Sequence, residues 1–362
     1  MNKSIALCCY FSVLISACGD AERISPDYIA SKLPPRALAD SCVMEIGQYK
    51  SESPSLASHH EGAIGKNGSQ HILISGFSDF REKTLLASSK VSLLQRDELT
   101  WQTMNIPAPI IGSHIQGASS QGKIWIAGGF IGSNPGKATD AVWSYDVKNE
   151  NWSNFTPLPR PLASGAFVAF NNALHFISGL EADRNTASKD HLVFDLKKRD
   201  GWKVRTKYPA PRNHFQAVSL GEFLFAIGGQ TGHDEKPVDV NTVDVYLPEK
   251  NVWHELTPMP ETKSHAESST FVHKNRIYVA GGRSDRNFDK WFGRDYGHSS
   301  DSILEYNPYT NSWRKVGILP LRLLAPFVRV IDDRLYISGG AHKWNQLQKE
   351  SWSAAMTYHC TE

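Results

Sequence analysis

Short apolar segments that end in glycine recur along this chain at nearly constant spacing. Apolar runs of this length, bounded by turn residues, are typical of buried β-strands. Their last glycines, at 76, 129, 179, 229, 282 and 340, stand 53, 50, 50, 53 and 58 residues apart. The spacing predicts six copies of one β-unit. The segments are HILISG at 71–76, KIWIAGG at 123–129, ALHFISG at 173–179, FLFAIGG at 223–229, RIYVAGG at 276–282 and RLYISGG at 334–340.

A second pattern recurs with the same period as the glycines. Tryptophans follow the first five glycine segments at 101, 152, 202, 253 and 313, and an apolar or aromatic residue stands seven or eight positions before each. Turn residues separate the segments about every ten positions. Each unit is therefore predicted to be four short antiparallel strands, which is one blade of a β-propeller. The residues before the tryptophans are Leu94, Tyr145, Phe194, Tyr246 and Tyr306.

These repeats resemble the Kelch repeat. Its marks are the double glycine, the tyrosine-to-tryptophan spacing and a following proline-rich segment with Arg and His, seen here as PAPRNHF at 209–215 and PMPETKSHA at 258–266. The resemblance covers roughly residues 42–360 and implies an all-β fold, a six-bladed Kelch-type propeller over residues 42–362. It implies little about activity, since one fold supports many functions.

The sixth unit is incomplete. Its third strand, SWSAAMTYHC, ends at Cys360, and no fourth strand follows. The segment around Ile46 stands at the right distance before Gly76 to supply that strand, so we expect an N-terminal strand to close the C-terminal blade and remove the exposed sheet edges. Cys42 and Cys360 flank this junction and are predicted to form a disulfide; two unpaired thiols are the alternative.

The N-terminus has the anatomy of an export signal. Lys3 precedes an apolar run, and Ile15-Ser16-Ala17-Cys18 resembles the lipobox of bacterial lipoproteins. We interpret residues 1–17 as a signal peptide, Cys18 as the lipidation site and 18–41 as a lipidated tether; an ordinary signal peptide cut nearby is the alternative. Gly19 after the cysteine favours the outer membrane. The expected location is the bacterial cell envelope, facing the periplasm, with the membrane as a partner through the lipid anchor.

Composition narrows the classes of partner. The formal net charge of +2 offers no strong field for nucleic acid, and none is expected as a partner. The histidines are scattered about one to a blade, without paired spacing, so neither a metal nor a cofactor is predicted. We expect a monomer.

Candidate ligand-binding residues gather where blades begin and in the long loop of blade five, 282–301, whose arginines and aromatics suit sugars or carboxylates. The alternatives are a solvated loop of mutually paired charges, and arginines and histidines that bond to neighbouring blade backbones. The candidates are Arg212, His214, His265, Arg283, Trp291, Arg294, His298, Arg322 and His342. His59 and His114 stand at similar places, and Glu181, Asp183, Asp234, Glu235 and Glu267 are acids without a defining spacing.

Two functions remain open at this stage. The first is an envelope-anchored binding or interaction module that takes a protein or carbohydrate ligand on its loop face. The second follows from a resemblance to the periplasmic N-acetylneuraminate epimerases, which are also six-bladed Kelch propellers: a mutarotase or epimerase acting on an acidic sugar such as sialic acid. No catalytic residue can be assigned by matching that family.

Overall fold

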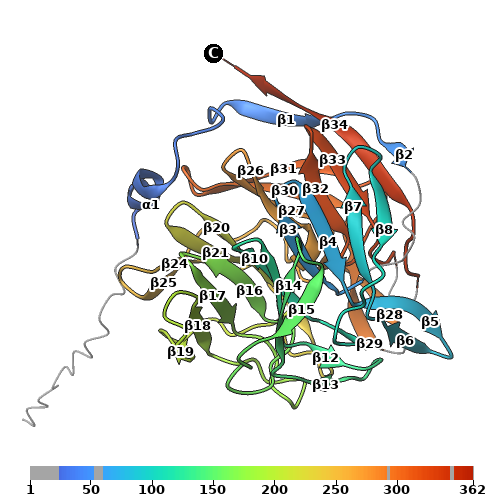
Figure 1. The fold of residues 1–362 in the computed structure, drawn as a ribbon. Coiled ribbons are helices and arrows are strands. Elements are labelled where there is room, and N and C mark those ends of the chain that lie inside the picture. Colours follow the sequence, from blue (N-terminus) through green and yellow to red (C-terminus); the bar gives the residue numbers. More distant parts are fainter. Residues whose placement is uncertain (1–23, 53–59, 292–293, 343–345, 362) are drawn as a thin grey trace, which may run out of the picture.

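The computed structural model describes residues 24–52, 60–291, 294–342 and 346–361, and for 285–291 and 294–298 it describes the backbone alone. Within these ranges the main strands form six antiparallel sheets around a central axis (Figure 1). Five sheets have four strands in sequence order. The sixth is completed from the other end of the chain. This is the predicted six-bladed propeller.

Each blade runs from an innermost strand at the axis to an outermost strand at the rim. Blade one is β3 (Ala63–Asn67), β4 (Gln70–Ile74), β7 (Val91–Gln95) and β8 (Thr100–Thr103); blade two is β10 (Gln116–Ser120), β11 (Lys123–Ala127), β14 (Val142–Asp146) and β15 (Asn151–Asn154); blade three is β16 (Ala166–Phe170), β17 (Ala173–Ile177), β18 (His191–Asp195) and β19 (Trp202–Val204). Blade four is β20 (Gln216–Leu220), β21 (Phe223–Ile227), β24 (Val243–Leu247) and β25 (Val252–Glu255); blade five is β26 (Thr270–His273), β27 (Arg276–Ala280), β30 (Ser302–Asn307) and β31 (Ser312–Ile318).

Blade six joins the two ends of the chain. It contains β32 (Phe327–Ile331), β33 (Arg334–Ser338) and β34 (Ser351–Cys360), and its fourth strand is β1 (Cys42–Ile46). A short strand, β2 (Lys50–Glu52), also pairs with β34. Cys42 is directly opposite Cys360 in the β1–β34 ladder, and the two form a disulfide. The predicted closure by the N-terminal strand is confirmed.

The tryptophan spacing has a simple structural cause. The aromatic residue of the third strand and the tryptophan of the fourth are cross-strand partners, as in the Tyr145–Trp152 and Tyr246–Trp253 pairs, whose ring centroids lie 5.0 and 5.1 Å apart. A fixed hairpin length therefore fixes the spacing. Such aromatic pairs occur in blades two to five and stabilise their outer halves, whereas blade one pairs Leu94 with Trp101.

The double glycines are required by close backbone approach. Gly229 has φ of 106°, and a Cβ there would lie 2.7 Å from the carbonyl oxygen of Asn213, where the chain enters the same blade. Any larger residue would push this connection away. The glycine signature thus marks the point where the second strand passes the start of its own blade.

The propeller has two different faces. We call the side with the connections between second and third strands and between blades the loop face, and the side with the short turns inside each blade the turn face. The loop face carries four small additional sheets (Figure 1). They comprise β5 (Phe77–Arg81) with β6 (Thr84–Ala87); β9 (Gly112–Ser113), β12 (Phe130–Ile131) and β13 (Lys137–Ala138); β22 (Gln230–Thr231) with β23 (Val238–Asp239); and β28 (Arg283–Trp291) with β29 (Arg294–Ser299).

The N-terminal segment lies on the turn face. Its helix α1 (Pro26–Lys32) buries Ile29 against blade four, and Tyr28 hydrogen-bonds to Glu249 in the turn between β24 and β25. Beyond the helix, the carbonyl of Pro34 accepts a hydrogen bond from Tyr309 of blade five. The described part of the predicted tether is therefore packed against the propeller. Among the described residues, no helix has the length and hydropathy needed to cross a membrane.

Candidate functional site

Six residues, one from each blade, form a ring around the axis. Each has a left-handed backbone conformation, with φ between 42° and 57°. The amide of a ring residue donates to the carbonyl of its counterpart in the preceding blade in five of the six steps, over 2.8 to 3.3 Å. This axial ring places neighbouring side chains close together at the loop-face side of the axis. Its members are Glu61, His114, Ser164, His214, His265 and Ala325.

Glu61 is surrounded by histidines. Its carboxylate oxygens lie 3.0 Å from Nε2 of His114, 3.3 Å from Nε2 of His60 and 3.6 Å from Nε2 of His265. The His214 ring stacks on His265 with centroids 4.1 Å apart. All five residues are at most 9% exposed. The axis therefore contains a buried group of one carboxylate and four imidazoles.

Burial sets the charge of these groups. It lowers the pKa of His114 to about 3 and holds the pKa values of His214 and His265 well below their usual range. These imidazoles are neutral at pH 7. Burial alone would raise the pKa of Glu61, but the neighbouring His114 and His60 outweigh it and lower that pKa below its ordinary range. Glu61 is thus ionised at pH 7.

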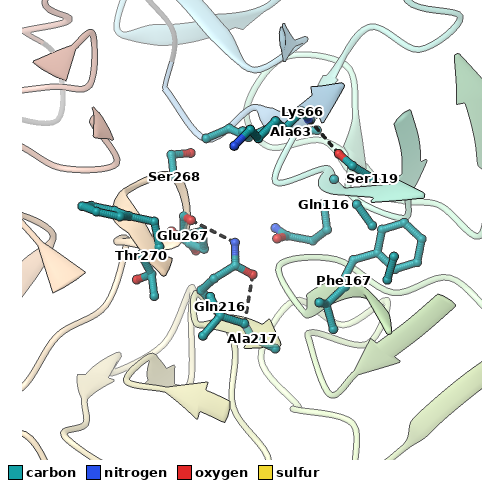
Figure 2. A pocket seen from close by; sticks show the side chains of 18 of the residues that line it. Ala63, Lys66, Gln116, Ser119, Phe167, Gln216, Ala217, Glu267, Ser268 and Thr270 are labelled. Atoms are coloured by element: carbon teal, nitrogen blue, oxygen red, sulfur yellow. Dashed lines mark hydrogen bonds between the residues drawn. The ribbon is translucent and has the colours of Figure 1, made fainter. Parts of the chain in front are cut away.

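The innermost strands enclose a central channel of about 390 Å³ on the other side of the ring. Figure 2 shows Lys66, Gln116, Gln216 and Glu267 around it, each contributed by a different blade. The buried ring closes the loop-face end of the channel. Lys66, at the far end of β3, is exposed, so the channel opens on the turn face. Its volume lies within the range of small-molecule sites.

The channel contains an unusual balance of charge. Among the described residues, neither Lys66 nor Arg329 has a carboxylate partner; Arg329 donates to the backbone carbonyls of Ser268 and Val328 over 2.8 and 2.7 Å. Burial lowers the pKa of Arg329 to about 10, which leaves it charged at pH 7. Burial raises the pKa of Glu267 to about 8, so this carboxyl is mostly protonated there. The channel therefore favours an anion.

Comparison with known proteins identifies the repeat. A model of the Kelch motif matches residues 113–159, 211–260 and 266–320, which cover blades two, four and five. These segments are Kelch motifs, and the fold is that of a Kelch-type β-propeller. Kelch propellers are common protein-interaction modules, and the structure shows how this one is closed and what lies at its axis.

The relatives of this Kelch propeller are distant. The chain is 25% identical over 256 residues to a Kelch repeat-containing protein of Arabidopsis thaliana, covering 65% of this chain and 58% of that protein. It is 28% identical over 198 residues to the human Kelch repeat and BTB domain-containing protein 12, covering 50% of this chain and 30% of that protein. The chain thus spans only part of these curated relatives. The solved structure of YjhT superposes with a TM-score of 0.68 at 13% identity, covering 85% of this chain and 99% of YjhT, which shows a shared fold.

Several predicted ligand-binding residues of this Kelch propeller are enclosed in it. Arg212 is 1% exposed; it pairs with Asp244 at 2.7 Å and donates to the carbonyl of Gly228 at 2.6 Å. Arg283, 8% exposed, makes a bidentate pair with Asp239. Arg212 fixes the entry segment of blade four to the strands of that blade, and Arg283 joins blade five to blade four. Both have the structural role that the sequence left open. His214 and His265 lie in the axial ring.

The remaining predicted residues lie nearer the surface. Arg322 is exposed and 3.8 Å from Asp301, and its backbone carbonyl lies 3.1 Å from Nδ1 of His342. Trp291, Arg294 and His298 belong to the β28–β29 hairpin, where only the backbone is described, and Trp291 pairs with Arg294 across it. Cys18 and His59 lie outside the described residues.

Sequence reasoning missed His60 and Glu61. It treated the histidines as scattered, whereas the ring brings them within contact of one carboxylate. A usable signal exists, because Glu61, His114 and His214 each stand fifteen residues before the last glycine of their blade, and His265 stands seventeen before. The two extra residues accompany the 3₁₀ turn η1 (Glu267–Ser269). Aligning blades on their glycines would have placed Glu61 among the histidines.

Proposed function

We propose that this Kelch propeller is a membrane-anchored binding module that presents its loop face to a partner protein. The observation that carries the proposal is the position of α1 on the turn face. Ile24 is only six residues from Cys18, a reach of about 20 Å. A lipid on Cys18 would hold the turn face toward the membrane and leave the loop face directed away from it.

The loop face has an apolar feature suited to a partner. Ile111 and Ile131 are 55% and 47% exposed. Ile131 is in β12 and Ile111 directly precedes β9, and the two segments lie side by side, since Ile131 pairs with Gly112 and the amide of Gly132 donates to the carbonyl of Ile111 at 2.8 Å. Adjacent exposed apolar side chains lose water when a protein covers them, which stabilises a complex. We propose this isoleucine pair as part of the binding surface.

Replacing both Ile111 and Ile131 by serine should weaken partner binding at least about tenfold, because two large apolar contacts are lost at the interface. Complexes captured from envelope extracts give the partner, and its affinity for the purified variants is then measured. Val204→Ser, which changes an equally exposed side chain on the rim of blade three, is the matched control. Equal affinity of the double variant and the control would contradict the proposed surface.

The channel favours a second candidate function, recognition of a small acidic sugar, with or without catalysis. Lys66 and Arg329 supply cationic donors that have no carboxylate partner within the described part of the chain, and the amides of Gln116 and Gln216 line the same cavity. Glu267, with a pKa of about 8, is matched to proton transfer near neutral pH. This combination supports a carboxylate-bearing sugar, and it moves the site from the loop face to the axis.

Saturation-transfer NMR with N-acetylneuraminate tests this second function. We expect transfer to this sugar but not to neutral N-acetylmannosamine, and at least about tenfold weaker binding after Lys66→Ala combined with Arg329→Gln. Lys148→Ala, at an exposed turn, is the control. Accelerated exchange between the anomers would add catalysis, with Glu267→Gln abolishing it. Equal transfer to the neutral sugar would exclude acid recognition in the channel.

A further inference from the structure

Three hydrogen-bond acceptors converge at the axial ring. The carboxylate of Glu61 and the ring nitrogens of His214 and His265 offer ligand atoms that all lie within 4.8 Å of one another. The group is buried and comes from blades one, four and five. What it can bind depends on which nitrogen of each imidazole carries the proton.

The surroundings of His214 decide its tautomer. Asn213 donates through Nδ2 to the carbonyl of Gly232 at 3.0 Å, so its Oδ1 is the atom that lies 2.6 Å from Nδ1 of His214. That amide oxygen can only accept, and Nδ1 of His214 must carry the proton. Nε2 is then a bare nitrogen. It is buried, and no described group hydrogen-bonds to it.

A similar series of hydrogen bonds determines the tautomer of His265. The carboxylate of Asp239 is bound by Arg283 and can only accept, so Ser264 donates its hydroxyl proton to Asp239 over 2.6 Å. The Ser264 oxygen therefore accepts from Nδ1 of His265 at 2.7 Å. Nε2 of His265 is also bare, and it faces Oε1 of Glu61 at 3.6 Å. Two lone pairs face each other there.

A cation bound between these acceptor atoms would remove the repulsion between their lone pairs. We propose that Glu61, His214 and His265 bind a divalent transition-metal ion of the zinc class at the closed end of the channel. Zinc takes imidazole nitrogen and carboxylate oxygen at about 2.0 to 2.1 Å, which in tetrahedral geometry puts ligand atoms about 3.4 Å apart. The side chains need to approach by roughly 1 Å. The partners of both Nδ1 atoms are the outer hydrogen bonds that orient histidine ligands in metal sites.

A second set, His114, His214 and His233, also has converging ligand atoms. In that set, Nδ1 of His114 lies 2.8 Å from the hydroxyl of Ser113, and its Nε2 lies 3.0 Å from Oε2 of Glu61, so both ring nitrogens already face other groups. The set with Glu61 also supplies a carboxylate, whose negative charge attracts a divalent ion more strongly than a third imidazole does. We therefore assign the ion to the Glu61 set.

The proposed ion site borders the channel. Gly62 and Glu267, close in sequence to Glu61 and His265, line the channel, which opens on the turn face. Three protein ligands leave one tetrahedral position for water or an anionic group. This site extends the molecule beyond protein binding, and it does not depend on the loop-face proposal.

Metal binding is measured on the purified propeller after treatment with chelator. We expect one Zn²⁺ per chain by isothermal titration and elemental analysis, and an absorption spectrum of tetrahedral Co²⁺ when Co²⁺ replaces it. Glu61→Gln and His214→Gln should each weaken binding at least tenfold. Asn213→Ala leaves all three ligands and should weaken it by about 10- to 100-fold, because the orienting hydrogen bond is lost. Far-UV circular dichroism checks that each variant is folded.

His359→Gln is the matched control, since it removes a surface histidine that lies 2.7 Å from Glu45. Its Zn²⁺ affinity should equal that of the wild type. Absence of stoichiometric Zn²⁺ or Co²⁺ binding would overturn the site, and so would binding that Glu61→Gln and Asn213→Ala leave unchanged. Loss of binding in His359→Gln alone would place the ion at the surface and equally overturn it.

Discussion

The free energy of unfolding should fall by at least about 3 kcal/mol between pH 7 and pH 5. Burial lowers the pKa values of His71 and His114 to about 3 and that of His175 to about 4. Below pH 6.5 these histidines bind protons in the unfolded chain but stay unprotonated in the native state. The free energy of unfolding therefore decreases as pH falls. Each histidine contributes about 2 kcal/mol by pH 5, and Glu267, with its raised pKa, offsets about 2 to 3 kcal/mol.

Urea unfolding at a series of pH values measures this loss. The profile should be steepest between pH 6.5 and 4, since the pKa values of His191, His214 and His265 are also well below the ordinary value. His71→Gln should flatten the profile, whereas His359→Gln, at an exposed position, should leave it unchanged. A flat profile in the wild type would show that these imidazoles are accessible to protons.

Removing the Cys42–Cys360 disulfide should lower the free energy of unfolding by up to about 5 kcal/mol. The bridge joins residues 318 apart in sequence, and cross-linking so long a loop removes much of the entropy of the unfolded chain. The Cys42→Ser, Cys360→Ser double variant should still fold, because the β1–β34 ladder and the core around Met44 and Met356 remain. Chemical denaturation of the double variant measures the difference.

Reduction of the wild-type protein is the control for that experiment and should give the same loss. Hydrogen exchange should then rise first in β1 and β34, the strands that close blade six, and last in blades two to four. Unchanged stability after reduction would mean that the strand pairing alone holds the ends. Earlier exchange in another blade would contradict the closing role of the bridge.

The repeating parts of the fold could be predicted from the sequence because each repeat carries its own evidence. The double glycines mark a close backbone approach, and the tyrosine-to-tryptophan spacing marks a cross-strand pair. The closure could be predicted because the sixth unit lacks a strand that the segment around Ile46 supplies. The glycine and tryptophan patterns depend on contacts between residues of one blade, and the closure follows from the number of strands in each repeat.

The site could be predicted only in part, because it depends on contacts between blades. Arg283 pairs with Asp239, 44 residues earlier, and no local pattern distinguishes this arginine from one that is free to bind a ligand. The histidines were found singly, but the contact of Glu61 with His114 and His265 follows from the circular arrangement of blades. Burial then sets their charges, and sequence spacing carries no information about burial.

Photo-cross-linking in intact cells tests the central claim, that an anchored propeller binds its partner through the loop face. A photoreactive amino acid is placed at position 131 on the loop face or at position 249 on the turn face, next to Tyr28. The account predicts a discrete protein adduct from position 131 in the membrane fraction, none from position 249, and loss of the adduct from that fraction after Cys18→Ala. A protein adduct from position 249 with none from position 131 would contradict it.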